Sequence, residues 1–212
     1  MHIYAFGSIC RGEISVCSDI DLLAIVEGHD SRFDADVYSI YSYNRVREIW
    51  KEGNPFAWHL YLESKLVFAS DRSNFLRSLG APTPYRNYVV DCDKFSSLFH
   101  DAHTSLKESA ASKIFDLSTM FLGMRNIATC FSLGCLAQPD FSRHAALRLG
   151  TYSLNIPQEA YQVFERARIL CTRGQGCNIE LDEIDQALAQ VDKVSQWMAK
   201  LNREAKNYAA RI

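Results

Sequence analysis

The chain changes character at Pro82 and Pro84, and this change constrains its fold more than any other feature of the sequence. Before the two prolines, short apolar runs alternate with Gly, Ser, Asp and Asn, which is typical of strands and short helices joined by turns. After them, apolar residues recur at helical spacing. We therefore predict an α+β protein, in which a small mixed-sheet domain with helices (residues 1–81) precedes an all-α helical bundle (residues 85–212).

The same patterns predict the individual elements. Alternating apolar and polar residues favour strands, and apolar residues three and four apart favour helices. In the first domain, strands are expected at 3–6, 20–26, 33–41 and 66–69, and helices at 44–51, 55–64 and 71–80. In the second domain, helices are expected at 91–109, 111–134, 142–150, 157–173 and 180–208.

A glycine–serine turn follows the first predicted strand. Gly7 leaves room for a ligand to approach the backbone, and Ser8 adds a hydroxyl group beside it. Arg11 adds a permanent cation whose forked donors suit a phosphate, although a solvent-exposed cation in a turn is an alternative. We therefore expect Gly7, Ser8 and Arg11 to bind the phosphates of a nucleotide.

Two carboxylates, Asp19 and Asp21, lie at the start of the second predicted strand. Because side chains alternate along a strand, both should point to one face, with Ile20 and Leu22 pointing into the core on the other. Neighbouring carboxylates repel each other, so the pattern favours a cation between them. Hard carboxylate oxygens favour Mg²⁺ over zinc, and bound Mg²⁺ commonly completes its shell with substrate phosphates. The turn and the carboxylates together therefore predict nucleotide chemistry.

The Gly7-Ser8 pair and the later string Ser18-Asp19-Ile20-Asp21 resemble the polymerase-β-type nucleotidyltransferase superfamily. The resemblance is to its minimal nucleotidyltransferases and its aminoglycoside adenylyltransferases. It implies that the sheet domain is a nucleotidyltransferase domain, that Gly7 and Ser8 contact the triphosphate of a nucleotide, and that Asp19 and Asp21 bind Mg²⁺.

The resemblance also implies a third carboxylate on a neighbouring strand. Asp36 is our candidate because it is expected inside the third strand, and Asp34, two residues earlier, is its rival. With Asp36, the expected catalytic and metal-binding set is Asp19, Asp21 and Asp36.

The activity that the resemblance implies is Mg²⁺-dependent transfer of a nucleoside monophosphate to a hydroxyl acceptor. AMP from ATP is the expected donor group, with another NTP as an alternative. The acceptor is expected to be an aminoglycoside-like small molecule or a protein. A second hypothesis is an antitoxin or regulatory binding protein that retains the nucleotide site but acts by blocking a partner.

Charge and composition limit the possible partners. Lys and Arg total 23 against 25 for Asp and Glu, so a nucleic acid is not an expected partner. No apolar run approaches the ~20 residues of a membrane helix, so no membrane association is expected. The seven cysteines are odd in number and include no Cys-x-x-Cys pair, which favours reduced thiols in the cytoplasm. A homodimer or a protein partner stays open.

Three further polar residues receive structural interpretations. Glu13 is expected to cap a short helix after the glycine–serine turn. Glu63 is interpreted as a surface residue of a helix, with a general base as the alternative, and His59 as a structural histidine.

Overall fold

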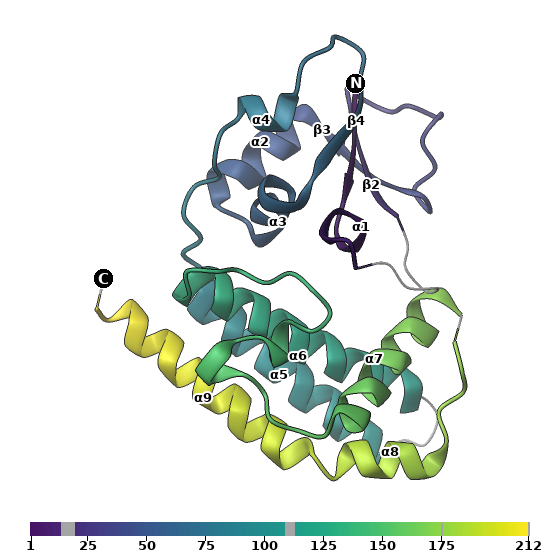
Figure 1. Cartoon of the computed structure of the whole chain (residues 1–212), viewed down its shortest axis with the longest axis vertical. Coiled ribbons are helices and arrows are strands. Elements are labelled where there is room, and N and C mark those ends of the chain that lie inside the picture. The colour runs from purple at the N-terminus through teal and green to yellow at the C-terminus, as the bar shows by residue number, and fades with distance from the viewer. Residues whose placement is uncertain (14–19, 109–112, 175, 212) are drawn as a thin grey trace. The chain divides into compact units, whose positions relative to one another are not determined.

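The chain divides into two compact units, Met1–Arg86 and Asn87–Ile212. Their small mixed sheet and mostly helical remainder, visible in Figure 1, confirm the predicted α+β class. The structure is a computed structural model, and the residues that it describes are 1–13, 20–108, 113–174 and 176–211.

The first unit contains a four-stranded mixed sheet in the order β3-β2-β1-β4. The strands are β1 (His2–Phe6), β2 (Asp21–Val26), β3 (Tyr38–Ser42) and β4 (Lys65–Ala69). β1 pairs antiparallel with both β2 and β4, whereas β2 pairs parallel with β3. The register places Phe6 opposite Asp21, so the end of β1 and the start of β2 lie side by side at one end of the sheet.

The third strand is shorter than the sequence predicts. β3 begins at Tyr38, and residues 33–37 form bends and turns instead of the first half of a strand. Asp34 holds this turn: its Oδ1 accepts from the Asp36 N–H at 2.9 Å, and its carbonyl accepts from the Tyr38 N–H at 2.8 Å. Such local bonds compete with the sheet ladder, so the expectation that Asp36 lies inside a strand is wrong.

Three helices of the first unit follow β3 in sequence. They are α2 (Tyr43–Glu52), α3 (Pro55–Glu63) and α4 (Phe75–Ser78). Ser42 caps α2, and Asn74 caps α4. Each cap side chain accepts a hydrogen bond from the backbone N–H three residues further on.

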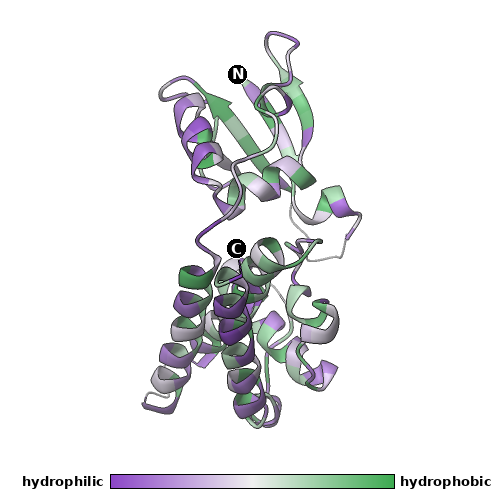
Figure 2. Cartoon of the chain, turned by 90° about the vertical axis from the view of Figure 1, so that its left-hand side faces the viewer, coloured by the Kyte–Doolittle hydropathy of each residue, from purple (hydrophilic) through white to green (hydrophobic). Residues whose placement is uncertain are grey.

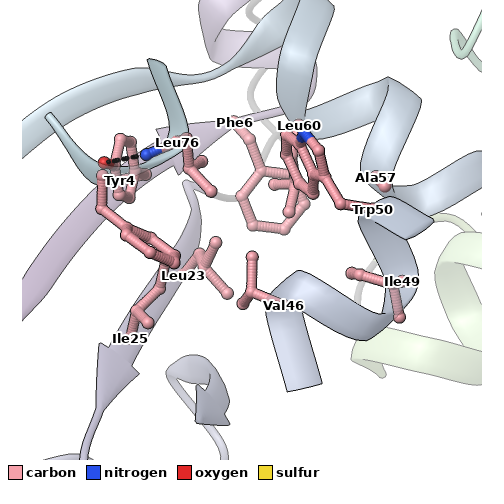
Figure 3. Close-up of a cluster of buried hydrophobic side chains, with 11 residues drawn as sticks. Tyr4, Phe6, Leu23, Ile25, Val46, Ile49, Trp50, Ala57, Leu60 and Leu76 are labelled. Carbon is pink, nitrogen blue, oxygen red and sulfur yellow. Dashed lines mark hydrogen bonds between the residues drawn. The ribbon is translucent and has the colours of Figure 1, made fainter. Parts of the chain in front are cut away.

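The core of this unit lies between the sheet and these helices (Figure 3). The side chains that meet there include Tyr4, Phe6, Leu23, Ile25, Val46, Ile49, Trp50, Ala57, Leu60 and Leu76. The buried Tyr4 hydroxyl is satisfied, because it accepts from the Leu76 N–H at 3.0 Å and donates to Asn74 Oδ1 at 3.0 Å. Figure 2 shows hydrophobic colour along much of the strands.

The core reverses one expectation about β2. Leu23 and Ile25 face the helices and are fully buried, whereas Ile20 is 57% exposed and Leu22 is only half-buried. The expectation that Ile20 and Leu22 point into the core is therefore wrong. Asp21 shares its side of the strand with Leu23, and it lies where that side emerges from the core.

The second unit is helical. It comprises α5 (Tyr88–Glu108), α6 (Lys113–Cys135), α7 (Gln158–Arg173), α8 (Leu181–Leu188) and α9 (Val191–Ala209), with the 3₁₀ turns η2 (Ala145–Leu147) and η3 (Gly150–Tyr152). The 3₁₀ turns replace the helix expected at 142–150. No helix among the described residues is long and apolar enough to cross a membrane.

The helix expected at 180–208 is two helices. Ile184 and Ala187 of α8 and Val191 and Val194 of α9 are all buried, so one apolar stripe continues across the break. The periodicity therefore could not reveal that the chain turns between the two helices.

Gly134 permits a close approach between α5 and α6, because a Cβ at this position would lie 2.4 Å from the Cβ of Tyr88. We expect Gly134→Ala to lower the free energy of unfolding by about 1–3 kcal/mol through overpacking. Alanine's better helix propensity, worth about 1 kcal/mol, is already part of this net change. Urea denaturation followed by circular dichroism measures it. Asn207→Ala on the exposed part of α9 is the control, and a stabilising Gly134→Ala would contradict the close packing.

Candidate active site

Gly7 stands where β1 ends and the short helix α1 (Ser8–Arg11) begins. Its φ of 75° is unfavourable for residues with a side chain. A Cβ at this position would lie 2.4 Å from Asp21 Oδ2, which is closer than any real contact. The backbone of the turn therefore packs directly against the Asp21 carboxylate, and only glycine allows it.

The remainder of the turn is closed by backbone hydrogen bonds. The Cys10 N–H donates to the Gly7 carbonyl at 3.0 Å, and the Glu13 N–H donates to the Ser8 carbonyl at 3.0 Å. Gly12, with φ 74°, ends α1 in the left-handed region. The three residues expected to bind phosphate, Gly7, Ser8 and Arg11, thus lie in one short segment of defined backbone.

The structure describes two of the three predicted metal ligands. Asp21 is exposed at the start of β2, and Asp19 lies outside the described residues. Because β2 and β3 pair in parallel, with Leu22 opposite Tyr38, Asp36 reaches the same end of the sheet as Asp21. Within the described ranges, no group of three His, Cys, Asp or Glu side chains is placed to hold a metal. The metal site therefore stays a prediction.

The two candidates for the third carboxylate behave differently. Asp34 uses its carboxylate to accept from the backbone of the turn, as described above. Both residues are exposed, Asp36 in the turn that leads into β3. Because the Asp34 carboxylate already accepts from the backbone, that of Asp36 is the better candidate to receive a ligand from solvent.

Arg11 is held by two carboxylates. Its Nε donates to Glu13 Oε2 at 2.9 Å, and its Nη1 donates to Glu63 Oε2. Burial alone would lower the pKa of the Arg11 guanidinium, but the hydrogen bonds to Glu13 and Glu63 outweigh it and raise that pKa above its usual value. Arg11 therefore remains a cation, and the alternative of a solvent-exposed turn cation is wrong, since its side chain is 19% exposed.

The interpretations of Glu13 as a helix cap and of Glu63 as a surface residue were both wrong, because both carboxylates pair with Arg11. Glu13 follows the end of α1 and pairs with Arg11 instead of capping the helix. The Glu63 side chain is only 15% exposed, because Arg11 and His59 lie against it. The spacing of His59 and Glu63, four residues apart in a helix, was the one sequence signal of a shared cluster.

Cys10 lies within α1 but is not suited to act as a nucleophile. Burial raises the pKa of its thiol, which keeps it protonated at neutral pH. Its Sγ donates to the Ala5 carbonyl at 3.4 Å. Cys10 is therefore interpreted as part of the packing between α1 and β1.

Residues 2–79 match the family model described as a nucleotidyltransferase domain. This segment is a nucleotidyltransferase domain. The match confirms the resemblance to the polymerase-β-type superfamily, and it identifies a transferase of nucleotidyl groups whose substrate includes a nucleotide. Comparison with curated proteins and with solved structures found no match. The nucleotidyltransferase domain contains the whole sheet, the Gly7 turn and Asp21.

The contact between Gly7 and Asp21 can be tested with a matched pair of glycines. Gly28 has nearly the same φ, 73° against 75°, but a Cβ there would have no atom within 4 Å. We expect Gly7→Ala to lower the free energy of unfolding by about 1–3 kcal/mol more than Gly28→Ala, because Gly7 combines φ 75° with ψ −144°, a region that is essentially restricted to glycine. The added Cβ would also force the Asp21 carboxylate to shift, whereas at Gly28 it would enter open space. Equal losses in chemical denaturation would contradict this expectation.

Proposed function

We propose that the chain is a Mg²⁺-dependent nucleotidyltransferase that moves a nucleoside monophosphate, AMP from ATP, to a hydroxyl acceptor. The observation that carries this proposal is the packing of the Gly7 turn against the Asp21 carboxylate. A phosphate bound at the turn would lie beside that carboxylate, and a divalent cation would relieve the repulsion between them.

The residues that would hold Mg²⁺ are Asp19, Asp21 and Asp36. They offer hard carboxylate oxygens, and the two residues that the structure describes, Asp21 and Asp36, lie at one end of the sheet. When bound, Mg²⁺ neutralises charge on the phosphates and on the leaving diphosphate. Asp36 would also accept the proton of the acceptor hydroxyl, because its exposed position leaves it open to a second substrate.

The phosphates themselves would be held by the turn. Gly7 and Ser8 would bind the β- and γ-phosphates through their backbone and the Ser8 hydroxyl. Arg11 would donate to a phosphate oxygen, since its guanidinium has five N–H donors and Glu13 and Glu63 contact only Nε and Nη1.

The acceptor that we propose is a hydroxyl group on an aminoglycoside-like small molecule or on a protein. ATP is the proposed donor, with GTP, CTP and UTP as the alternatives that the experiment below includes. The proposed place of action is the cytoplasm, which the odd number of cysteines supports.

Three Asp→Asn variants test the proposed metal site. Transfer of label from α-labelled ATP, GTP, CTP and UTP is measured with Mg²⁺ and a panel of hydroxyl acceptors. We expect Asp21→Asn and Asp36→Asn to lower kcat/KM by more than about 100-fold, since loss of a residue that merely supports a metal ligand already costs about 10–100-fold. Asp34→Asn should cost much less, because its amide oxygen can still accept from the Asp36 N–H.

Calorimetry with Mg²⁺ and ATP provides an independent readout of the same site. Binding should weaken in Asp21→Asn and Asp36→Asn and persist in Asp34→Asn. Undiminished binding in Asp21→Asn would overturn the proposed site. If Asp34→Asn lost activity while Asp36→Asn remained active, Asp34 and not Asp36 would be the third carboxylate of the site.

A further inference from the structure

The C-terminal half of α3 carries Glu63, which contacts Arg11, and His59, which lies against Glu63. Glu63 Oε2 accepts from Arg11 Nη1 and lies 3.0 Å from His59 Nε2. The side chains of Glu63 and His59 are 15% and 13% exposed, so this contact is largely shielded from water. The ion pair between Arg11 and Glu63, whose side chains are 19% and 15% exposed, is therefore screened less than an ion pair at the surface. The position of the Arg11 guanidinium is therefore determined by a helix as well as by its own turn.

The same helix connects this cluster to the core and to the strand end. The His59 ring meets the Phe6 ring edge to face, with the centroids 5.6 Å apart. Phe6 is the last residue of β1 and pairs with Asp21 in the sheet. Arg11, Glu63 and His59 thus form one connected cluster with the strand end that faces Asp21.

We propose that Glu63 is a positioning residue, which fixes the Arg11 guanidinium for the phosphates of the nucleotide. The inference rests on the proposed function, since it takes Arg11 to be a phosphate donor. A free arginine side chain loses much rotamer freedom when it binds a ligand, and prior fixation by Glu63 lowers that cost.

Charge and anchoring must be separated in the test, because the Glu63 carboxylate also repels a phosphate. Glu63→Gln and Glu63→Met remove the same negative charge and have similar length. Only glutamine keeps an oxygen that can accept from Arg11 Nη1. A difference between the two variants therefore reports the anchor alone.

The experiment measures the binding of ATP, GTP, CTP and UTP, each with Mg²⁺, by calorimetry. We expect Glu63→Met to bind the preferred NTP roughly threefold to tenfold more weakly than Glu63→Gln, in keeping with the cost of immobilising one flexible side chain. In an Arg11→Met background the difference should disappear, because Glu63 acts through Arg11. A merely structural role of Glu63 would leave the difference unchanged in that background.

The control pair is Glu52→Gln and Glu52→Met on α2. Glu52 also accepts from an arginine, with its Oε1 3.2 Å from Arg45 Nη1, but it is 51% exposed. These two variants should bind NTP equally. Thermal melting of every variant checks the fold, and Glu63→Ala replaces Glu63→Met if the latter does not fold.

The outcomes separate the two proposals. Equal binding by Glu63→Gln and Glu63→Met, beside normal wild-type binding, would overturn the positioning role and leave the proposed function standing. A difference that persists in the Arg11→Met background would also overturn the positioning role. A wild-type chain that binds none of the four NTPs would overturn the proposed function and the positioning role together.

Discussion

The close approach of the Gly7 backbone to the Asp21 carboxylate is the constraint on which the site depends. It requires a residue without a Cβ, a positive φ and the pairing of Phe6 with Asp21 across two antiparallel strands. Strand parity places the side chain of Asp21 on the same side of β2 as the buried Leu23 and Ile25, at the end of the strand where that side leaves the core. The packing of Leu23 and Ile25 into the core therefore also fixes the side of β2 on which Asp21 lies.

α3 links the core to the turn. Its buried face contributes Ala57 and Leu60 to the core. Its last residue, Glu63, contacts Arg11, and His59 lies 3.0 Å from Glu63 one turn earlier. Because the helix is held by apolar packing, the polar cluster at its end has a rigid base. A turn of only four helical residues would otherwise have few contacts to define the arginine that it carries.

Some features were predictable from local pattern alone. The strands β1, β2 and β4 and the helices α2, α3, α5, α6 and α7 were expected within a few residues of their observed bounds, because their periodicity and flanking residues agree. The length of β3 was overestimated because the Asp34 side chain stabilises a turn within a sequence of alternating apolar and polar residues. The break between α8 and α9 was missed because one apolar stripe runs across it.

The sequence by itself determined the fold class, the nature of the nucleotidyltransferase domain and the proximity of a glycine–serine turn to acidic residues, because these follow from residue type and spacing. The tertiary structure alone decided that Leu23 and Ile25 of β2 pack against the helices, since those helices come later in the chain. It also decided that Glu63, distant in sequence, lies against Arg11. Contacts between distant segments depend on packing geometry, which local spacing does not encode.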